Sequence, residues 1–203
     1  MAAMSSPNGF LNFPKSVCSF DGTTFAVDPR YKIRCRIGQG AQGVICSAID
    51  QHSPDNREMA VKKMPNALDE VMASKRLLRE LRLLRHLKHE NILSLTDIML
   101  PPSTNVLLWK DVYTVSELMD TDLNYVITSG QEITDDHVQY FTAQLLAGIS
   151  YLHRCNVVHR DLKVGALGER RAASPALATV DCTASSYSSS HSLIRCAHMH
   201  TAK

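Results

Sequence analysis

Residues 157–163 read Val-Val-His-Arg-Asp-Leu-Lys (VVHRDLK), and the character of the chain changes directly after them. Before this stretch, apolar residues recur with the periods of strands and helices. After Val164 the sequence is dominated by Ala and Ser, shows no sustained period and offers few large apolar side chains. Such a segment has little apolar surface to bury against the entropy of ordering it. We therefore predict a folded region that ends at Lys163 and a disordered tail over residues 164–203.

The composition favours a soluble, intracellular protein, located in the cytoplasm, the nucleus or both. The chain has 203 residues, an apolar fraction of 44% and a net charge of +2. This charge does not favour nucleic acid as a partner, and no apolar run approaches the about 18 residues of a membrane span. Six scattered cysteines without a C-x-x-C pattern are typical of reduced thiols. Cys196, His198 and His200 lack a second ligand cluster, so we predict no metal site there.

The patterns before Lys163 predict a small sheet followed by helices. Prolines and glycines punctuate residues 1–30, which indicates an extended arm. Alternating apolar residues predict strands, and apolar stripes at spacings of three and four predict helices. Strands are expected at 31–37, 44–50 and 59–63 and within 91–99 and 105–119; helices are expected at 68–89, at 120–127 and from Thr134 onwards. The last helix has an apolar face from Val138 to Leu152, which we expect to be left exposed.

Gly38, Gly40 and Gly43 form a G-x-G-x-x-G pattern, which alone is most often a flexible turn. A dinucleotide-binding loop would lead into a helix, and a Walker A loop would carry Lys and Ser or Thr where Val44 and Ile45 stand. A strand on each side instead predicts a hairpin whose backbone N–H groups can close over phosphates, because glycine has no side chain to block the approach. Ile45 is placed to cover an apolar base.

Lys62 ends an Ala-Val-Lys run beside Lys63, which by itself is most simply a solvated pair of lysines. Glu80 changes this interpretation, because it lies on the apolar face of its predicted helix, between Leu77 and Leu84. A carboxylate there is costly unless it is paired. A bond from Arg76 within the helix would contribute only about 0.2–0.5 kcal/mol. We favour the alternative, in which Glu80 meets Lys62 across the fold and holds its ammonium against a phosphate.

The order and spacing of these motifs resemble the protein kinase family. Three segments are similar to mitogen-activated protein kinases in particular: KRLLRELRLLRHLKHENILSL, DVYTVSELMDTDLNYVI and DDHVQYFTAQLLAGISYLHRCNVVHRDLK. The resemblance covers about residues 28–163 and implies an α+β fold. That fold is a kinase N-lobe of antiparallel sheet plus one helix, followed by the first helices of an incomplete C-lobe. The implied divisions are an arm at 1–27, an N-lobe at 28–115, a hinge and C-lobe start at 116–163 and a non-homologous tail at 164–203.

The same resemblance implies a Ser/Thr kinase that uses ATP, protein substrates and upstream kinases as partners. The implied ATP contacts are Ile37, Gly38, Gln39, Gly40, Ala41, Gln42, Gly43, Val44, Ile45, Ala60, Lys62, Lys63, Glu80, Ser116, Glu117, Leu118, Met119 and Asp122. Among these, Ser116 would guard the back of the adenine pocket, Glu117 to Met119 would be the hinge and Asp122 would approach the ribose. Asp161 would deprotonate the substrate hydroxyl, and Lys163 would stabilise the transferring phosphoryl group. Gln42 replaces the aromatic residue usual at the loop tip, which is expected to loosen the cap over the phosphates.

The sequence departs from the kinase pattern after Lys163. The family has a Mg²⁺-binding Asn where Ala166 stands, and no D-F-G follows; Asp181 lies near that position but precedes Cys-Thr. Mg²⁺ is expected for the family, but its ligands are missing, and metal ions neutralise much of the charge in phosphoryl transfer. We therefore expect this chain to be catalytically inactive. It remains open whether it is a kinase by descent, a non-catalytic nucleotide- or partner-binding fragment, or a product of missplicing, a frameshift or faulty gene prediction.

Overall fold

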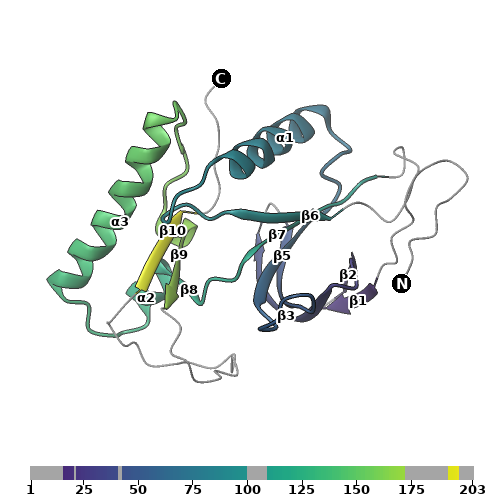
Figure 1. The fold of residues 1–203 in the computed structure, drawn as a ribbon, viewed down its shortest axis with the longest axis horizontal. Helices are drawn as coiled ribbons and strands as arrows, with labels where there is room; N and C mark the ends of the chain where they lie inside the picture. Colours follow the sequence, from purple (N-terminus) through teal and green to yellow (C-terminus); the bar gives the residue numbers. More distant parts are fainter. Residues whose placement is uncertain (1–15, 21, 41–42, 100–108, 172–191, 197–203) are drawn as a thin grey trace, which may run out of the picture. The chain divides into compact units, whose positions relative to one another are not determined.

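The computed structural model describes residues 16–20, 22–40, 43–99, 109–171 and 192–196. It divides into two compact units, each described here by itself. The first unit comprises Met1–Leu81 and Leu95–Leu118, and the second comprises Arg82–Ser94 and Met119–Lys203. Most strands belong to the first unit, and the longest helix belongs to the second (Figure 1).

The first unit is built on a five-stranded antiparallel sheet in the order β3-β4-β5-β7-β6 (Figure 1). Its strands are β3 (Tyr31–Gly40), β4 (Gly43–Asp50), β5 (Glu58–Met64), β6 (Leu95–Met99) and β7 (Val112–Glu117). They correspond to the strands that the alternating apolar pattern predicts. The antiparallel kinase-like sheet expected from the resemblance is therefore confirmed.

A two-stranded hairpin precedes this sheet and contributes to its core. It consists of β1 (Ser16–Phe20) and β2 (Thr23–Val27), and the side chains of Phe25 and Val27 are buried. They belong to one apolar cluster with alternate residues of the sheet: Tyr31, Val44, Cys46, Ala48, Met59, Val61, Met99, Tyr113 and Val115. The sequence prediction of an extended arm is therefore wrong for residues 16–20 and 22–27. Phe25 and Val27 share one face of a strand, and that face is buried.

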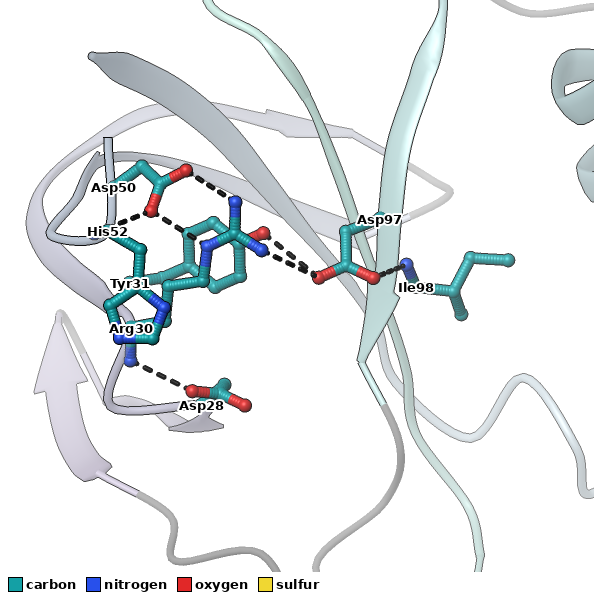
Figure 2. Close-up of polar contacts among 7 residues, drawn as sticks. All are labelled: Asp28, Arg30, Tyr31, Asp50, His52, Asp97 and Ile98. Carbon is teal, nitrogen blue, oxygen red and sulfur yellow. Dashed lines mark hydrogen bonds and ion pairs between the residues drawn. The ribbon is translucent and has the colours of Figure 1, made fainter. Parts of the chain in front are cut away.

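A polar cluster at the end of β4 stabilises the same unit (Figure 2). The Arg30 guanidinium donates from Nε to Asp50 Oδ1 at 2.8 Å and from Nη2 to Asp50 Oδ2 at 2.7 Å (Figure 2). The hydrogen bond from Arg30 lowers the pKa of the Asp50 carboxyl, and the bond from the His52 N–H adds to this. Because the Asp50 side chain is almost fully buried, the two-pronged pair supplies the counter-charge that it needs.

Helix α1 (Val71–His86) begins and ends inside the predicted range 68–89. The Leu68 N–H donates to the Lys110 carbonyl, and Asn66 adopts a left-handed conformation with φ 52°. Residues before Val71 are thus held in a turn, which explains the later start of the helix.

The second unit contains α2 (Leu123–Thr128), α3 (Asp135–Arg154), a 3₁₀ turn η2 (Val164–Ala166) and three strands. The strands β8 (Thr121–Asp122), β9 (Leu167–Arg171) and β10 (Ser192–Cys196) form an antiparallel sheet in the order β10-β9-β8. Helix α3 starts where the sequence predicts, with Thr134 as its N-cap and Asp135 and Asp136 in the first turn. It ends before Asn156, whose left-handed backbone (φ 56°) terminates the helix.

The core of the second unit covers much of the apolar face of α3. Phe141 and Leu152 are buried, whereas Val138 is 53% exposed. Their partners in the cluster are Leu87, Ile92, Val126, Val157 and Leu167. The expectation that the whole face is left exposed is therefore wrong, because neighbouring segments of this same unit cover it.

Two parts of the predicted tail lie among the described residues, and both form secondary structure. Ala166 and Leu167 are buried, and β9 pairs with β8 on one side and with β10 on the other. Backbone hydrogen bonds order these segments where few large side chains are available. Residues 172–191 and 197–203, with Asp181, His198 and His200, lie outside the described part, and disorder there stays a prediction. Within the described residues, every helix is too short or too polar to cross a membrane.

Candidate functional site

The glycine pattern lies on a hairpin, as predicted. β3 pairs with β4 up to Gly40 opposite Gly43, and Gly38 lies opposite Ile45. Ala41 and Gln42, between them in sequence, lie outside the described residues. Ile37 is 49% exposed, and the Gln39 side chain accepts a hydrogen bond from Arg36 at 3.0 Å.

Gly43 is required for a reason that the motif does not reveal. Its φ is +133°, and a Cβ atom there would lie 2.0 Å from the Lys63 carbonyl oxygen. The backbones of β4 and β5 therefore approach each other too closely for any side chain at this position. At Gly40, by contrast, an added Cβ would meet no atom within 4 Å.

The predicted contact residues of the sheet divide between its two faces. Ile45, Ala60, Lys62 and Ser116 occupy paired positions on one face, which we call the Lys62 face. Val44, Lys63 and Glu117 point to the opposite face, which carries the buried apolar cluster. The structure therefore brings the first four together and separates them from the other three side chains.

Lys62 is half-buried, and its ammonium interacts with the carboxylate of Glu80 on α1. Burial lowers the pKa of Lys62, and the negative charge of Glu80 opposes this shift. The structure thus places the two charges together within the first unit, as the apolar position of Glu80 predicts. A partly dehydrated ammonium held by one carboxylate is well suited to bind a second anion.

Lys63 has a different environment. Its Nζ donates to the Thr24 carbonyl at 2.7 Å, lies 2.8 Å from Asp111 Oδ2 and lies 5.7 Å from the centre of the Tyr113 ring. Burial would lower the pKa of Lys63, but the hydrogen bond and charge of Asp111 and the contact with Tyr113 raise it above its usual value. These contacts attach the β1–β2 hairpin to the sheet, and they occupy the ammonium.

The end of β7 holds the predicted hinge residues of the first unit. Ser116 lies opposite Ala60 on one side and Leu95 on the other. The Glu117 side chain is almost fully buried and lies 3.5 Å from Arg57 Nη2. Leu118 follows as the last residue of the first unit.

In the second unit, Met119 and Asp122 have local structural contacts. A Cβ at Gly168 would lie 2.7 Å from Met119 Cγ, so Gly168 allows β9 to pack against the Met119 side chain. Asp122 is the N-cap of α2, where its Oδ1 accepts a hydrogen bond from the Tyr125 N–H at 2.8 Å. Its approach to a ribose stays a prediction.

The VVHRDLK stretch forms a loop in the second unit with Asp161 and Lys163 side by side. Asp161 Oδ2 lies 3.0 Å from Lys163 Nζ, and both side chains reach solvent. His159 is buried, and its Nδ1 accepts a hydrogen bond from the Asp161 N–H at 3.2 Å. Between them, Arg160 adopts a left-handed conformation with φ 68°, which turns the chain. The arrangement presents a carboxylate to solvent beside a cation.

The family model described as protein kinase domain matches residues 31–167, about two thirds of the chain. The chain belongs to the protein kinase family. The match continues past the boundary predicted at Lys163 and includes η2 and the first residue of β9. The resemblance recognised from GxGxxG, AVK and HRDLK is therefore confirmed.

Individual relatives of this protein kinase chain are mitogen-activated protein kinases of plants. Mitogen-activated protein kinase 7 of Arabidopsis thaliana is 47% identical over 161 residues, which cover 79% of this chain and 43% of the relative. Mitogen-activated protein kinase 3 of Oryza sativa subsp. japonica is 47% identical over 79% of this chain and 42% of its own length. Mitogen-activated protein kinase 4a of Physcomitrium patens is 51% identical over 70% of this chain and 37% of its own length. The chain spans about two fifths of the length of these relatives.

Protein kinases in general use ATP and Mg²⁺, but the donor set at Ala166 does not fit the metal. Ala166 is 2% exposed and its side chain carries no oxygen, whereas Mg²⁺ requires oxygen ligands. Among the described residues, His, Cys, Asp and Glu nowhere gather in a group of three that could hold a metal ion. We therefore assign no step of the chemistry to a metal bound here.

The sequence reasoning missed two residues of this kinase chain that position predicted site residues. His159 supports the Asp161 backbone through a hydrogen bond. The sequence feature that could have indicated this role is a titratable side chain directly after the apolar Val157 and Val158. Arg57 pairs with Glu117, and no local pattern around Arg57 marks it, because the two residues are 60 positions apart in sequence.

Proposed function

We propose that the chain binds ATP as a protein kinase upper lobe does, through the glycine hairpin and the Lys62 face of the first unit. The observation that carries this proposal is the Lys62–Glu80 interaction. Burial lowers the pKa of Lys62, and the charge of Glu80 offsets this only in part, so the lysine holds its charge at a cost. Phosphate oxygens would give the ammonium a second set of charge-assisted hydrogen bonds.

The remaining nucleotide contacts are proposed from the kinase resemblance, and for Ile45, Ala60 and Ser116 their position on the sheet supports it. Ile45 and Ala60 would cover the base from the Lys62 face, and Ser116 stands at the end of the same row. The backbone of Glu117 to Met119 would meet the adenine edge, and Asp122 would approach the ribose. Val44 and Lys63 would contribute through their backbones, because their side chains point to the other face. The lobe divisions at 28–115 and 116–163 are part of the same proposal.

The proposed activity is that of a Ser/Thr kinase of the mitogen-activated type, with Asp161 as base and Lys163 as stabiliser of the phosphoryl group. The two side chains lie together in the second unit, which supports these roles. With Ala166 in place of a metal ligand, we propose that this chain binds nucleotide but does not transfer phosphate. Protein substrates, upstream kinases and a cytoplasmic or nuclear location are further proposals that rest on the family.

Nucleotide binding is tested with ATP by calorimetry on the full chain and on two neighbouring variants. Lys62→Met is expected to weaken binding about 10- to 100-fold, because hydrogen bonds between charged groups contribute about 1.5–3 kcal/mol. Lys63→Met is the matched control, and it should leave the affinity within about twofold because its ammonium faces Asp111 and Thr24. Equal losses in both variants, or no ATP binding by the wild-type chain, would refute the proposal.

Catalytic inactivity is tested by transfer of labelled phosphate from ATP to a basic protein substrate in the presence of Mg²⁺. We expect no transfer above background. Robust transfer that disappears in Asp161→Asn would show that the chain is an active kinase despite Ala166. The transcript across Lys163 and Val164 would show whether another reading frame resumes the kinase pattern.

A further inference from the structure

Arg57 lies in the connection between β4 and β5, outside every motif that the family resemblance uses. Its Nη2 lies 3.5 Å from Glu117 Oε2, and the two side chains differ sharply in exposure, at 52% for Arg57 and 8% for Glu117. Met59, two residues after Arg57, pairs directly with Glu117 across β5 and β7. Arg57 directly precedes β5, so its side chain reaches the end of β7 from the neighbouring strand end.

The backbone of Arg57 is fixed by the cluster of Figure 2. The Asp50 N–H donates to the Arg57 carbonyl at 2.9 Å, which closes the β4–β5 connection. Asp50 is in turn held by the two hydrogen bonds from Arg30 (Figure 2). The Gln51 N–H also donates to the Arg30 carbonyl at 2.9 Å. Arg57 thus projects from a loop base that is tied at several points.

Glu117 needs a positive partner because it is an ionisable group buried on the apolar face of the sheet. Its neighbours on β7 at the same face are Tyr113 and Val115, both buried. A buried carboxylate that loses a counter-charge is strongly destabilised. The strand end can relieve this by moving the carboxylate to water, and the backbone of Glu117 and Leu118 would move with it.

We propose that Arg57 is a positioning residue that holds Glu117, and through it the backbone of Glu117 and Leu118, in the conformation that receives the adenine edge. The inference rests on the proposed nucleotide-binding function for its consequence, although the restraint on the backbone is present without ligand. Arg57 itself touches no nucleotide in this arrangement.

The experiment compares Arg57→Met with Glu117→Gln and with the double variant, in the full chain. Binding of a fluorescent ADP analogue is measured by titration, and amide hydrogen exchange is measured at Glu117 and Leu118 without nucleotide. Arg57→Met is expected to weaken binding about tenfold, equivalent to about 1.4 kcal/mol, and to speed exchange at both amides. In the double variant, the nucleotide affinity and the exchange rates of the two amides should lie within about threefold of those of Glu117→Gln. The reason is that the neutral amide of Gln does not require the Arg57 guanidinium as a counter-charge.

Arg34→Met provides a matched control. Arg34 is 51% exposed and lies 3.3 Å from Glu58, whose side chain is 31% exposed, so this pair involves no buried carboxylate. It should leave binding and exchange within about twofold of wild type. The positioning role of Arg57 would be refuted, and the proposed function left standing, by either of two results. In the first, Arg57→Met binds the nucleotide as tightly as the wild-type chain. In the second, the double variant binds as weakly as Arg57→Met. Absence of binding in the wild-type chain would overturn the proposed function, and unchanged exchange in Arg57→Met would then overturn the positioning role as well.

Discussion

The Tyr31 hydroxyl donates a hydrogen bond of 2.9 Å to Asp97 Oδ2, although the two residues are 66 positions apart in sequence. Tyr31 begins β3 and Asp97 lies on β6, and these are the two edge strands of the five-stranded sheet. The sheet therefore curls until its edges can be bridged by one side chain (Figure 2). Burial raises the pKa of Tyr31, and the hydrogen bond and charge of Asp97 raise it further, so the phenol stays a donor at neutral pH.

Tyr31→Phe removes this bridge while it keeps the buried ring. We expect the free energy of unfolding to fall by about 1 kcal/mol, the usual net contribution of one hydrogen bond. Urea denaturation of both proteins measures the difference. Tyr140→Phe is the control, because Tyr140 is 48% exposed on α3 and should show no change. Equal effects of the two substitutions would contradict a special role for the bridge.

Gly43→Ala should be among the most destabilising small substitutions in the first unit. The added Cβ would collide with the Lys63 carbonyl, and the positive φ is unfavourable for alanine. Strain of this kind costs about 1–3 kcal/mol before the collision is counted. Gly40→Ala has open space around the new Cβ and should change the unfolding free energy by about 0.5 kcal/mol or less. Thermal or urea unfolding of the pair distinguishes a packing requirement at Gly43 from a general need for flexibility in the hairpin.

Glu80→Gln should lower the pKa of Lys62 further. Burial of Lys62 already lowers this pKa, and the substitution removes the negative charge that opposes the shift. The titration of the Lys62 side chain can be followed by NMR, with Lys62→Met to assign its signal. Glu70→Gln, at an exposed position just before the helix, should leave the titration unchanged. A Lys62 pKa that does not respond to Glu80→Gln would show that the two charges do not interact in solution.

Lys63→Met should loosen the β1–β2 hairpin. It removes the hydrogen bond to the Thr24 carbonyl and the ion pair with Asp111, and we expect a loss of about 1–3 kcal/mol in the free energy of unfolding. Amide exchange over Thr23 to Val27 should accelerate. Lys32→Met, at an exposed position of β3, is the control and should leave both measurements unchanged. A rigid hairpin in the Lys63 variant would show that its apolar contacts alone are sufficient.

Acid should weaken the cluster of Figure 2 through Asp50. The pKa of this carboxyl in the folded protein lies below its usual value of 3.8, chiefly because Arg30 donates to it. The unfolded state therefore binds the proton more tightly, and the stability that the pair contributes is present above about pH 4–5 and lost as the pH falls through the folded-state pKa. The difference in unfolding free energy between wild type and Asp50→Asn should be constant near neutral pH and shrink below pH 3.8. A difference that does not depend on pH would indicate that the Asp50 charge contributes nothing.

The elements and motifs that the sequence predicts correctly depend on local patterns. The alternation in β3 to β5, the helix start at Thr134 and the glycine hairpin each involve residues within a few positions of one another. The errors arose where local signals were weak: residues 16–27 are punctuated by turns yet bury Phe25 and Val27, and β9 is ordered by backbone pairing with β8. The apolar face of α3 was expected to lack partners because some of those partners, such as Leu87 and Ile92, come from a segment more than 40 positions before the helix.

By itself, the sequence determined the family of the chain, because GxGxxG, AVK and HRDLK stand in the order and spacing of protein kinases along one backbone. It also determined that Ala166 cannot supply a metal ligand. Only the tertiary structure decided that Lys63 anchors the β1–β2 hairpin, that Gly43 is fixed by the Lys63 carbonyl and that Arg57 faces Glu117. These relationships depend on strand register and on burial, which bring together residues whose separation in sequence carries no signal.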